Sequence, residues 1–163
     1  MEMQGTNLFI VDDNKLLVAT LSQYLQNRFG PSMHITTFNS GESCLEKIDE
    51  KTDIVILDYQ MEGKNGLEVL KSIKAVNSKT EVIMLSSNED MALSIESFKS
   101  GAKDYVIKGT GSWKKVGKLV NHVVTAPIRL MVKEFSISKQ LAILLTAFIV
   151  IGIVVFCALQ MMK

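Results

Sequence analysis

The sequence has few of the residues that build disulfide frameworks or metal-thiolate sites, with two cysteines and two histidines among 163 residues. Cys44 and Cys157 show no metal-ligand spacing, so we expect reduced thiols and no disulfide. His34 and His122 have no evident partners and are interpreted as structural. The first residues, MEMQG, are polar without a basic flank and do not resemble a signal peptide.

The formal net charge of +1 conceals an uneven distribution along the chain. Residues 1–108 hold 11 basic and 16 acidic side chains, whereas residues 109–139 hold 6 basic side chains and 1 acidic one. An acidic stretch, residues 1–108, therefore precedes a basic stretch, residues 109–139. The chain length accommodates one domain of ordinary size and a modest appendage.

Residues 54–57, IVIL, are four consecutive aliphatic residues followed by Asp58. A half-exposed strand would alternate with polar residues, so this run predicts a strand buried on both faces. Similar short runs predict four further strands, at residues 7–11, 34–38, 81–85 and 104–107.

Helical spacing of apolar residues alternates with these strands, at 15–29, after residue 39, and at 67–75, 90–100 and 112–124. Asn39 and Glu42 match a capping box for the second helix. Its buried face would hold Cys44, Leu45 and Ile48. Gly101 predicts the end of the fourth helix. Five alternating strands and helices predict an α/β fold with a doubly wound parallel sheet.

Polar residues end four of these strands, at Asp12-Asp13, Asp58, Ser86 and Lys108. The carboxyl ends of parallel strands meet at one edge of a sheet, where ligands bind in α/β folds. Asp58 alone could equally be a turn residue, but the convergence of these side chains favours a site. Clustered carboxylates stay ionised beside a hard cation, which predicts Mg²⁺. Lys108 and Ser86 would complement a phosphoryl group on Asp58.

These residues resemble the receiver domain of two-component response regulators. The resemblance covers about residues 7–124 and rests on Asp12-Asp13, Asp58-Tyr59-Gln60-Met61, Gly66, Ser86-Ser87 and residues 101–108, GAKDYVIK. It implies a flavodoxin-like, five-stranded parallel sheet with the strand order 2-1-3-4-5.

The resemblance also implies a role for each residue that handles the phosphoryl group. Asp58 is the phosphoacceptor, Lys108 binds the phosphoryl oxygens, and Ser86 moves to hydrogen-bond the phosphoryl group. Tyr105 resembles the aromatic switch residue, whose ring turns inward when Ser86 moves. The plain alternatives are a loop cap for Ser86, a packed strand aromatic for Tyr105 and a surface charge for Lys108.

For the metal, the resemblance implies that Asp13, Asp58 and the backbone carbonyl of Gln60 hold Mg²⁺, while Asp12 supports the ion through water. The sequence departs from the family at Gly109, where proline usually follows the lysine, commonly with a cis peptide bond. Glycine does not favour a cis bond, so we expect a looser loop after Lys108. Glu62 stands where the family often has proline. Neither change removes a chemical group.

Residues 141–159 contain no charged side chain, and a helix of that length would span the hydrocarbon core of a bilayer, which is about 30 Å thick. A buried soluble helix or a dimerisation segment is the alternative. Basic residues precede this stretch and only Lys163 follows it, which predicts a cytoplasmic receiver domain. We thus expect a receiver domain at 5–125, a basic juxtamembrane linker at 126–139 that Pro127 separates from the last helix, and one transmembrane helix at 140–160.

The sequence therefore predicts a response regulator anchored in the cell membrane that accepts a phosphoryl group from a histidine kinase or phosphotransfer protein. Its output would be contact with an unknown downstream protein, or withdrawal of phosphoryl groups from a relay. We expect no enzymatic turnover beyond its own phosphorylation and dephosphorylation, and no nucleic-acid binding, because no DNA-binding motif follows the receiver. The alternatives are a phosphorylation-independent membrane adaptor and a haloacid dehalogenase-type phosphatase. The latter family has a second aspartate where Gln60 stands.

Overall fold

The computed structural model describes residues 5–87, 89–134 and 148, with residues 126–134 described as backbone alone. Five strands are present: β1 (Thr6–Val11), β2 (Met33–Phe38), β3 (Ile54–Asp58), β4 (Glu81–Ser86) and β5 (Asp104–Ile107). The helices are α1 (Lys15–Phe29), the short 3₁₀ helix η1 (Gly30–Ser32), α2 (Gly41–Leu45), α3 (Gly66–Val76), α4 (Met91–Lys99) and α5 (Ser112–Glu134).

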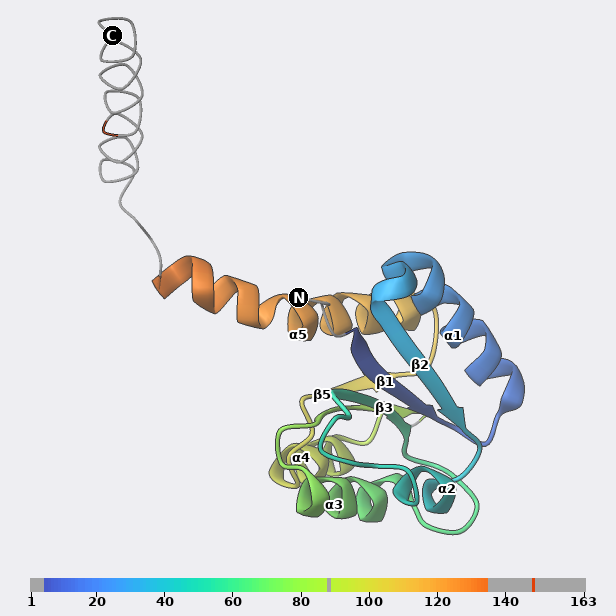
Figure 1. The fold of residues 1–163 in the computed structure, drawn as a ribbon. Coiled ribbons are helices and arrows are strands. Elements are labelled where there is room, and N and C mark those ends of the chain that lie inside the picture. The colour runs from blue at the N-terminus through green and yellow to red at the C-terminus, as the bar shows by residue number, and fades with distance from the viewer. Residues whose placement is uncertain (1–4, 88, 135–147, 149–163) are drawn as a thin grey trace, which may run out of the picture. The chain divides into compact units, whose positions relative to one another are not determined.

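The five strands form one sheet in the order β2-β1-β3-β4-β5, and every adjacent pair is parallel. This arrangement confirms the predicted flavodoxin-like order (Figure 1). All five residues of the central strand β3 are buried. Its aliphatic run is therefore covered on both faces, as predicted, and its last residue is Asp58.

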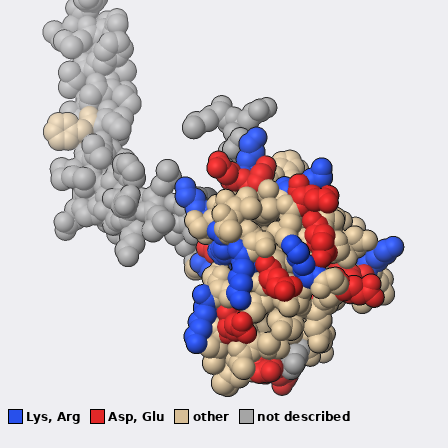
Figure 2. Space-filling model, turned by 90° about the horizontal axis from the view of Figure 1, so that it is seen from below, with Lys and Arg blue, Asp and Glu red and all other residues tan. Residues whose placement is uncertain are grey.

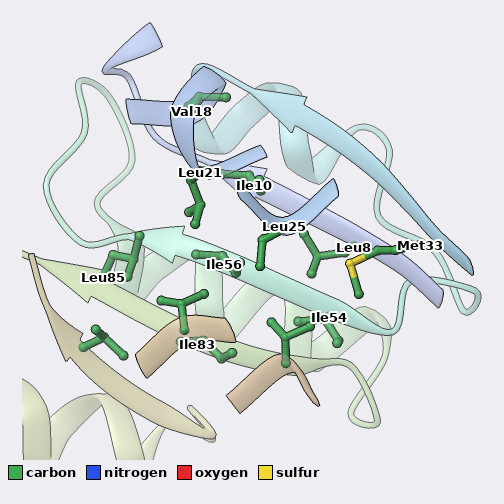
Figure 3. Packing of buried hydrophobic residues seen from close by; sticks show 13 residues of the cluster. Leu8, Ile10, Val18, Leu21, Leu25, Met33, Ile54, Ile56, Ile83 and Leu85 are labelled. Atoms are coloured by element: carbon green, nitrogen blue, oxygen red, sulfur yellow. The ribbon is translucent and has the colours of Figure 1, made fainter. Parts of the chain in front are cut away.

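Helices α1 and α5 cover one face of the sheet, and α2, α3 and α4 cover the other (Figure 1). Alternate residues of β3 divide between two hydrophobic clusters, because successive side chains of a strand point to opposite faces. Ile54 and Ile56 join the cluster beneath α1 and α5, which Figure 3 shows in part. Val55 and Leu57 join the cluster on the other face. Two packed faces hold β3, and thus Asp58, in place.

The capping box predicted at Asn39 and Glu42 is wrong. Ser40 is the N-cap of α2, and its side chain accepts a hydrogen bond from the Ser43 backbone nitrogen. Glu42 instead accepts a hydrogen bond of 2.9 Å from the backbone nitrogen of Lys64. A true capping box occurs one helix later, at Asn65 and Glu68 of α3.

The last helix differs from its predicted extent. It begins at Ser112 as expected but continues to Glu134, so the prediction that Pro127 ends it is wrong. Proline removes one backbone donor and can kink a helix without ending it. Helix α5 therefore occupies residues 126–134 of the predicted linker, while residues 135–139 lie outside the described part of the chain.

Residues up to Val124 belong to one compact unit. In the described ranges, no helix has both the length and the apolar composition that crossing a bilayer requires. The predicted transmembrane helix at 140–160 lies outside the described residues, apart from Phe148.

Candidate functional site

The carboxyl ends of the strands bring the predicted side chains to one edge of the sheet. Asp58 ends β3 and is paired with Leu85, the residue before Ser86. Ser86 in turn is paired with Ile107, the residue before Lys108. Asp12 directly follows β1. The parallel register therefore places these groups on adjacent strands, as the sequence predicted.

Lys108 lies between two buried carboxylates. Its Nζ atom is 2.8 Å from Asp12 Oδ2 and 2.8 Å from Asp58 Oδ1. The side chains of Asp12 and Asp58 are 1% and 2% exposed, against 18% for Lys108. Lys108 is therefore a site residue in its geometry, which excludes the alternative of a plain surface charge.

The electrostatic surroundings of the site raise the pKa values of both Asp58 and Lys108 above their ordinary values. Burial raises the pKa of Asp58, Lys108 beside it lowers that pKa, and the charge of Asp12 raises it again, with a net upward shift. Burial alone would lower the pKa of Lys108, but its contacts with Asp12 and Asp58 raise it overall. Two carboxylates sharing one ammonium leave the cluster with excess negative charge.

Asp12, Asp13 and Asp58 each offer a carboxylate oxygen, and these oxygens lie within 4.8 Å of one another. Asp13 is exposed, whereas the other two are buried. Asp12 Oδ2 and Asp58 Oδ1 each have Lys108 Nζ as an ionic partner at 2.8 Å. Three neighbouring carboxylates, two of them buried, fit a hard divalent cation such as Mg²⁺.

Ser86 and Tyr105 are both buried, at 0% and 7% exposure. Tyr105 packs in the hydrophobic cluster on the α2 and α3 face of the sheet. Tyr105 with its ring is therefore buried in this structure. Movement of this ring together with Ser86 stays a prediction.

The loop after Lys108 is held on both sides despite Gly109. The Lys108 backbone nitrogen donates to Ser86 O at 2.7 Å. Ser112 donates to Gly109 O through both its backbone nitrogen, at 3.1 Å, and its Oγ, at 2.8 Å. Ser112 is therefore a residue that the sequence reasoning missed, although a serine at a helix start is a recognisable signal.

Two further residues that support the site, Asn14 and Glu42, were not identified from the sequence as site residues. The Asn14 backbone nitrogen donates to Asp12 Oδ1 at 2.9 Å, while the Asn14 side chain caps α1. Glu42 holds the loop that follows Asp58 through Lys64. The cap at Asn14 has a sequence signal, since asparagine is favoured before a helix, whereas the partner of Glu42 lies 22 residues away and has none.

Gly66 allows the backbone of α3 to approach the end of β3. A Cβ atom on Gly66 would collide with the Asp58 carbonyl oxygen and lie 2.8 Å from Tyr59 Cα, whereas a Cβ on Gly109 would meet nothing within 4 Å. We therefore expect Gly66→Ala to lower the free energy of unfolding by about 2 kcal/mol. Gly109→Ala should change it by less than about 1 kcal/mol.

Urea unfolding of the full chain in nonionic detergent, followed through Trp113, the single tryptophan, measures both effects. The two variants add the same methyl group, so their difference isolates the backbone contact at Asp58. Equal urea midpoints for the two variants would contradict the close approach.

Comparison with known proteins is consistent with this geometry. The family model for the response regulator receiver domain matches residues 8–118. The transcriptional regulatory protein ZraR of Klebsiella oxytoca is 33% identical over 109 residues, which are 66% of this chain and 24% of ZraR. The heme response regulator HssR of Staphylococcus epidermidis is 36% identical over 103 residues, 63% of this chain and 44% of HssR. The chain thus spans less than half the length of these relatives.

Solved structures show the same likeness. The BeF3-activated receiver domain of DrrB has a TM-score of 0.66 and 28% identity, covering 74% of this chain and 97% of that one. The response regulator TrrA of Thermotoga maritima, in complex with Mg(2+)-BeF, has a TM-score of 0.64 and 27% identity, covering 72% and 98%.

Proposed function

Because the chain belongs to the response regulator receiver domain family, we propose that Asp58 accepts a phosphoryl group from a phosphohistidine on a histidine kinase or phosphotransfer protein. Receiver domains of two-component systems are phosphorylated on aspartate and interact with such donors. The observation that supports Asp58 as the acceptor is its burial at the end of β3, with Lys108 Nζ at 2.8 Å. The donor is a separate protein.

In the proposed step, a carboxylate oxygen of Asp58 attacks the phosphorus atom of the donor. The new P–O bond forms an acyl phosphate while the P–N bond to the donor histidine breaks, and the imidazole nitrogen keeps the electron pair. Lys108 offsets the negative charge that gathers on the phosphoryl oxygens. Such transfers depend on positioning and charge neutralisation, which a rigid strand end and a paired lysine provide.

Asp13, Asp58 and the Gln60 carbonyl would hold Mg²⁺, with Asp12 supporting it through water. The ion supplies charge neutralisation at the phosphoryl oxygens. The exposed position of Asp13 next to two buried acids leaves one side of the cluster accessible from solvent. This arrangement suits an ion that keeps some of its water ligands.

We assign the conformational response to phosphorylation to Ser86 and Tyr105. A hydrogen bond from the Ser86 hydroxyl to the phosphoryl group would move Ser86 and favour the inward Tyr105 ring. Output would follow through contact with a downstream protein or through withdrawal of phosphoryl groups from a relay. The chain would turn over no separate substrate.

Phosphate incorporation from acetyl phosphate into the full chain, with Mg²⁺ and with a chelator, tests the phosphoacceptor function. We expect an adduct that requires Mg²⁺, survives acid and is lost in base, as an acyl phosphate is. Mass spectrometry should place it on the peptide that contains Asp58. A folded chain without an adduct would favour a binding module that works unphosphorylated.

We also propose that residues 140–160 anchor the chain in the cell membrane, with the receiver domain on the cytoplasmic side. The uncharged run at 141–159 and the preceding basic residues support this proposal. Membranes from expressing cells should retain the chain after carbonate extraction. Protease added from the cytoplasmic side should digest the receiver domain. Release by carbonate would contradict the anchor and leave the phosphoacceptor proposal unaffected.

A further inference from the structure

The loop between β3 and α3, residues 59–65, lies outside the helices and strands. It contains Gln60, whose carbonyl is a proposed Mg²⁺ ligand. The Gly66 backbone nitrogen donates to Tyr59 O at 2.9 Å, which ties the two ends of the loop together. Between these ends, residues 60–63 form no hydrogen bond with the backbone of any described residue. The middle of the loop therefore depends on side chains for its position.

The side chain that reaches this loop from another element is Glu42 of α2. Its Oε1 atom accepts the 2.9 Å hydrogen bond from the Lys64 backbone nitrogen. Gly63 lies directly against the same carboxylate, since a Cβ atom there would be 2.8 Å from Glu42 Oε1 and 3.3 Å from its Cδ. Gly63 also has a φ of 80°, which side chains disfavour. The loop backbone therefore fits around the Glu42 carboxylate at two consecutive residues.

Helix α2 holds the backbone of Glu42 in a fixed position. Helices α2 and α3 lie side by side on one face of the sheet (Figure 1). A Cβ atom on Gly41 would collide with Val69 of α3, so the start of α2 is in close contact with α3. Cys44, two residues after Glu42, is fully buried. Glu42 thus connects a packed helix to the loop.

The Glu42 carboxylate is ionised and held by hydrogen bonds. Its own backbone nitrogen and then that of Lys64 lower the pKa of Glu42. Among the described residues, the carboxylates that could share a metal ion are those of Asp12, Asp13 and Asp58, without Glu42. Figure 2 shows acidic and basic side chains interspersed over the face that α2, α3 and α4 cover. One carboxylate among these mixed charges sets no strong local potential, so its influence on the site passes through the loop.

The loop also contacts Asp58. Burial raises the pKa of Asp58, and a hydrogen bond from the Gln60 backbone is among the contacts that lower it. The same residue would offer its carbonyl to Mg²⁺. Groups that orient a metal ligand from outside the coordination sphere typically change metal affinity by about 10–100-fold when they are lost. A displaced loop would therefore affect the ion.

We propose that Glu42 is a positioning residue for the Mg²⁺ site, because its hydrogen bond fixes the loop conformation in which Gln60 offers its carbonyl to the ion. This inference rests on the proposed function, in which Asp13, Asp58 and Gln60 hold Mg²⁺. Loss of the Glu42 contact weakens Mg²⁺ binding and leaves the Asp58 nucleophile intact once the ion is bound. A purely structural Glu42 would instead change stability and leave Mg²⁺ binding unaltered.

Urea unfolding of the full chain in nonionic detergent, in chelator and at increasing Mg²⁺, separates these two roles. A ligand that binds the folded chain alone raises its stability with concentration, so the titration gives the Mg²⁺ dissociation constant. We expect Glu42→Ala to raise this constant by about three- to tenfold, because Glu42 acts on the ligand through the loop. In chelator its urea midpoint should stay close to that of the wild type. Phosphate incorporation from acetyl phosphate should need more Mg²⁺ and reach the wild-type rate at saturation.

Two further variants identify the hydrogen bond as the cause. Glu42→Gln removes the charge but keeps an oxygen that can accept from Lys64, so it should bind Mg²⁺ nearly as tightly as the wild type. Glu46→Ala removes the same charge at the C-cap of α2, where the side chain is exposed. It should leave the Mg²⁺ dissociation constant unchanged.

Other results overturn the proposal in distinguishable ways. An unchanged dissociation constant in Glu42→Ala would make Glu42 a structural contact. Equal weakening in Glu42→Ala and Glu42→Gln would show that charge sets the affinity. A wild-type chain that gains no stability from Mg²⁺ would reject the metal site and this inference with it. If Mg²⁺ stabilises the wild type but no adduct forms, the phosphoacceptor function fails, while weaker binding in Glu42→Ala still supports the positioning role.

Discussion

The Asp58→Asn chain is expected to take up no phosphate from acetyl phosphate while resisting urea better than the wild type. The amide has no carboxylate oxygen that can attack phosphorus, so the loss of the adduct should be complete. The stability effect follows from burial, which raises the pKa of Asp58. A raised carboxyl pKa means that the ionised form opposes folding at neutral pH, and the uncharged amide removes that cost. Lys108 keeps Asp12 as its partner.

Asp13→Asn is the matched control for this prediction. It makes the same chemical change at an exposed member of the same cluster. It leaves the Asp58 nucleophile in place, so the adduct should still form, more slowly and at higher Mg²⁺ concentration. Undiminished incorporation in Asp58→Asn would place the acceptor at another residue.

The sheet could be predicted from the sequence because its strands are short, nearly continuous apolar runs. Such runs are what a parallel sheet covered on both faces requires, and β3 is the clearest case, with all five residues buried. The alternation of strands and helices then fixed the class of fold. The strand order needed the family resemblance, since hydrophobic pattern alone does not say which strands are neighbours.

The ends of helices were less predictable. Asn39 with Glu42 and Ser40 with Ser43 have the same spacing, and both are plausible caps. The choice depends on Glu42, which reaches Lys64 in a distant loop. Local preference predicts a helix end at Pro127, yet α5 continues past it.

The residues that form the candidate site could be predicted from the sequence, but the contacts between their side chains could not. Strand ends at one edge bring Asp12, Asp58 and Lys108 together whatever their rotamers. The sequence does not reveal that one ammonium serves both carboxylates, nor that Asp13 is exposed while Asp12 is buried. Those facts depend on the packing of the strands, and they determine the charge balance of the site.

Lys108→Met should be the most destabilising of the substitutions considered. Methionine keeps most of the apolar volume of the lysine stem but removes the charge, which leaves Asp12 and Asp58 buried and facing each other. Removing one partner from a buried ion pair costs about 3–5 kcal/mol, and the partial exposure of Lys108 favours the lower end. Urea unfolding in chelator at neutral pH, followed through Trp113, measures the loss. Lys103→Met removes a lysine from the more exposed pair with Glu81 and should cost no more than about 1 kcal/mol.

Three further measurements would show that the stability lost in Lys108→Met arises from the buried charges. Adding Asp58→Asn to Lys108→Met should restore most of the stability, because one of the two unpaired carboxylates is then neutral. Mg²⁺ should narrow the gap between Lys108→Met and the wild type by supplying the missing positive charge. The gap should also close as the pH rises through the raised pKa of Lys108, because the wild-type lysine then loses its own charge. A loss of stability that neither Asp58→Asn nor Mg²⁺ reduces would show that Lys108 supports the fold through packing, with its charge incidental.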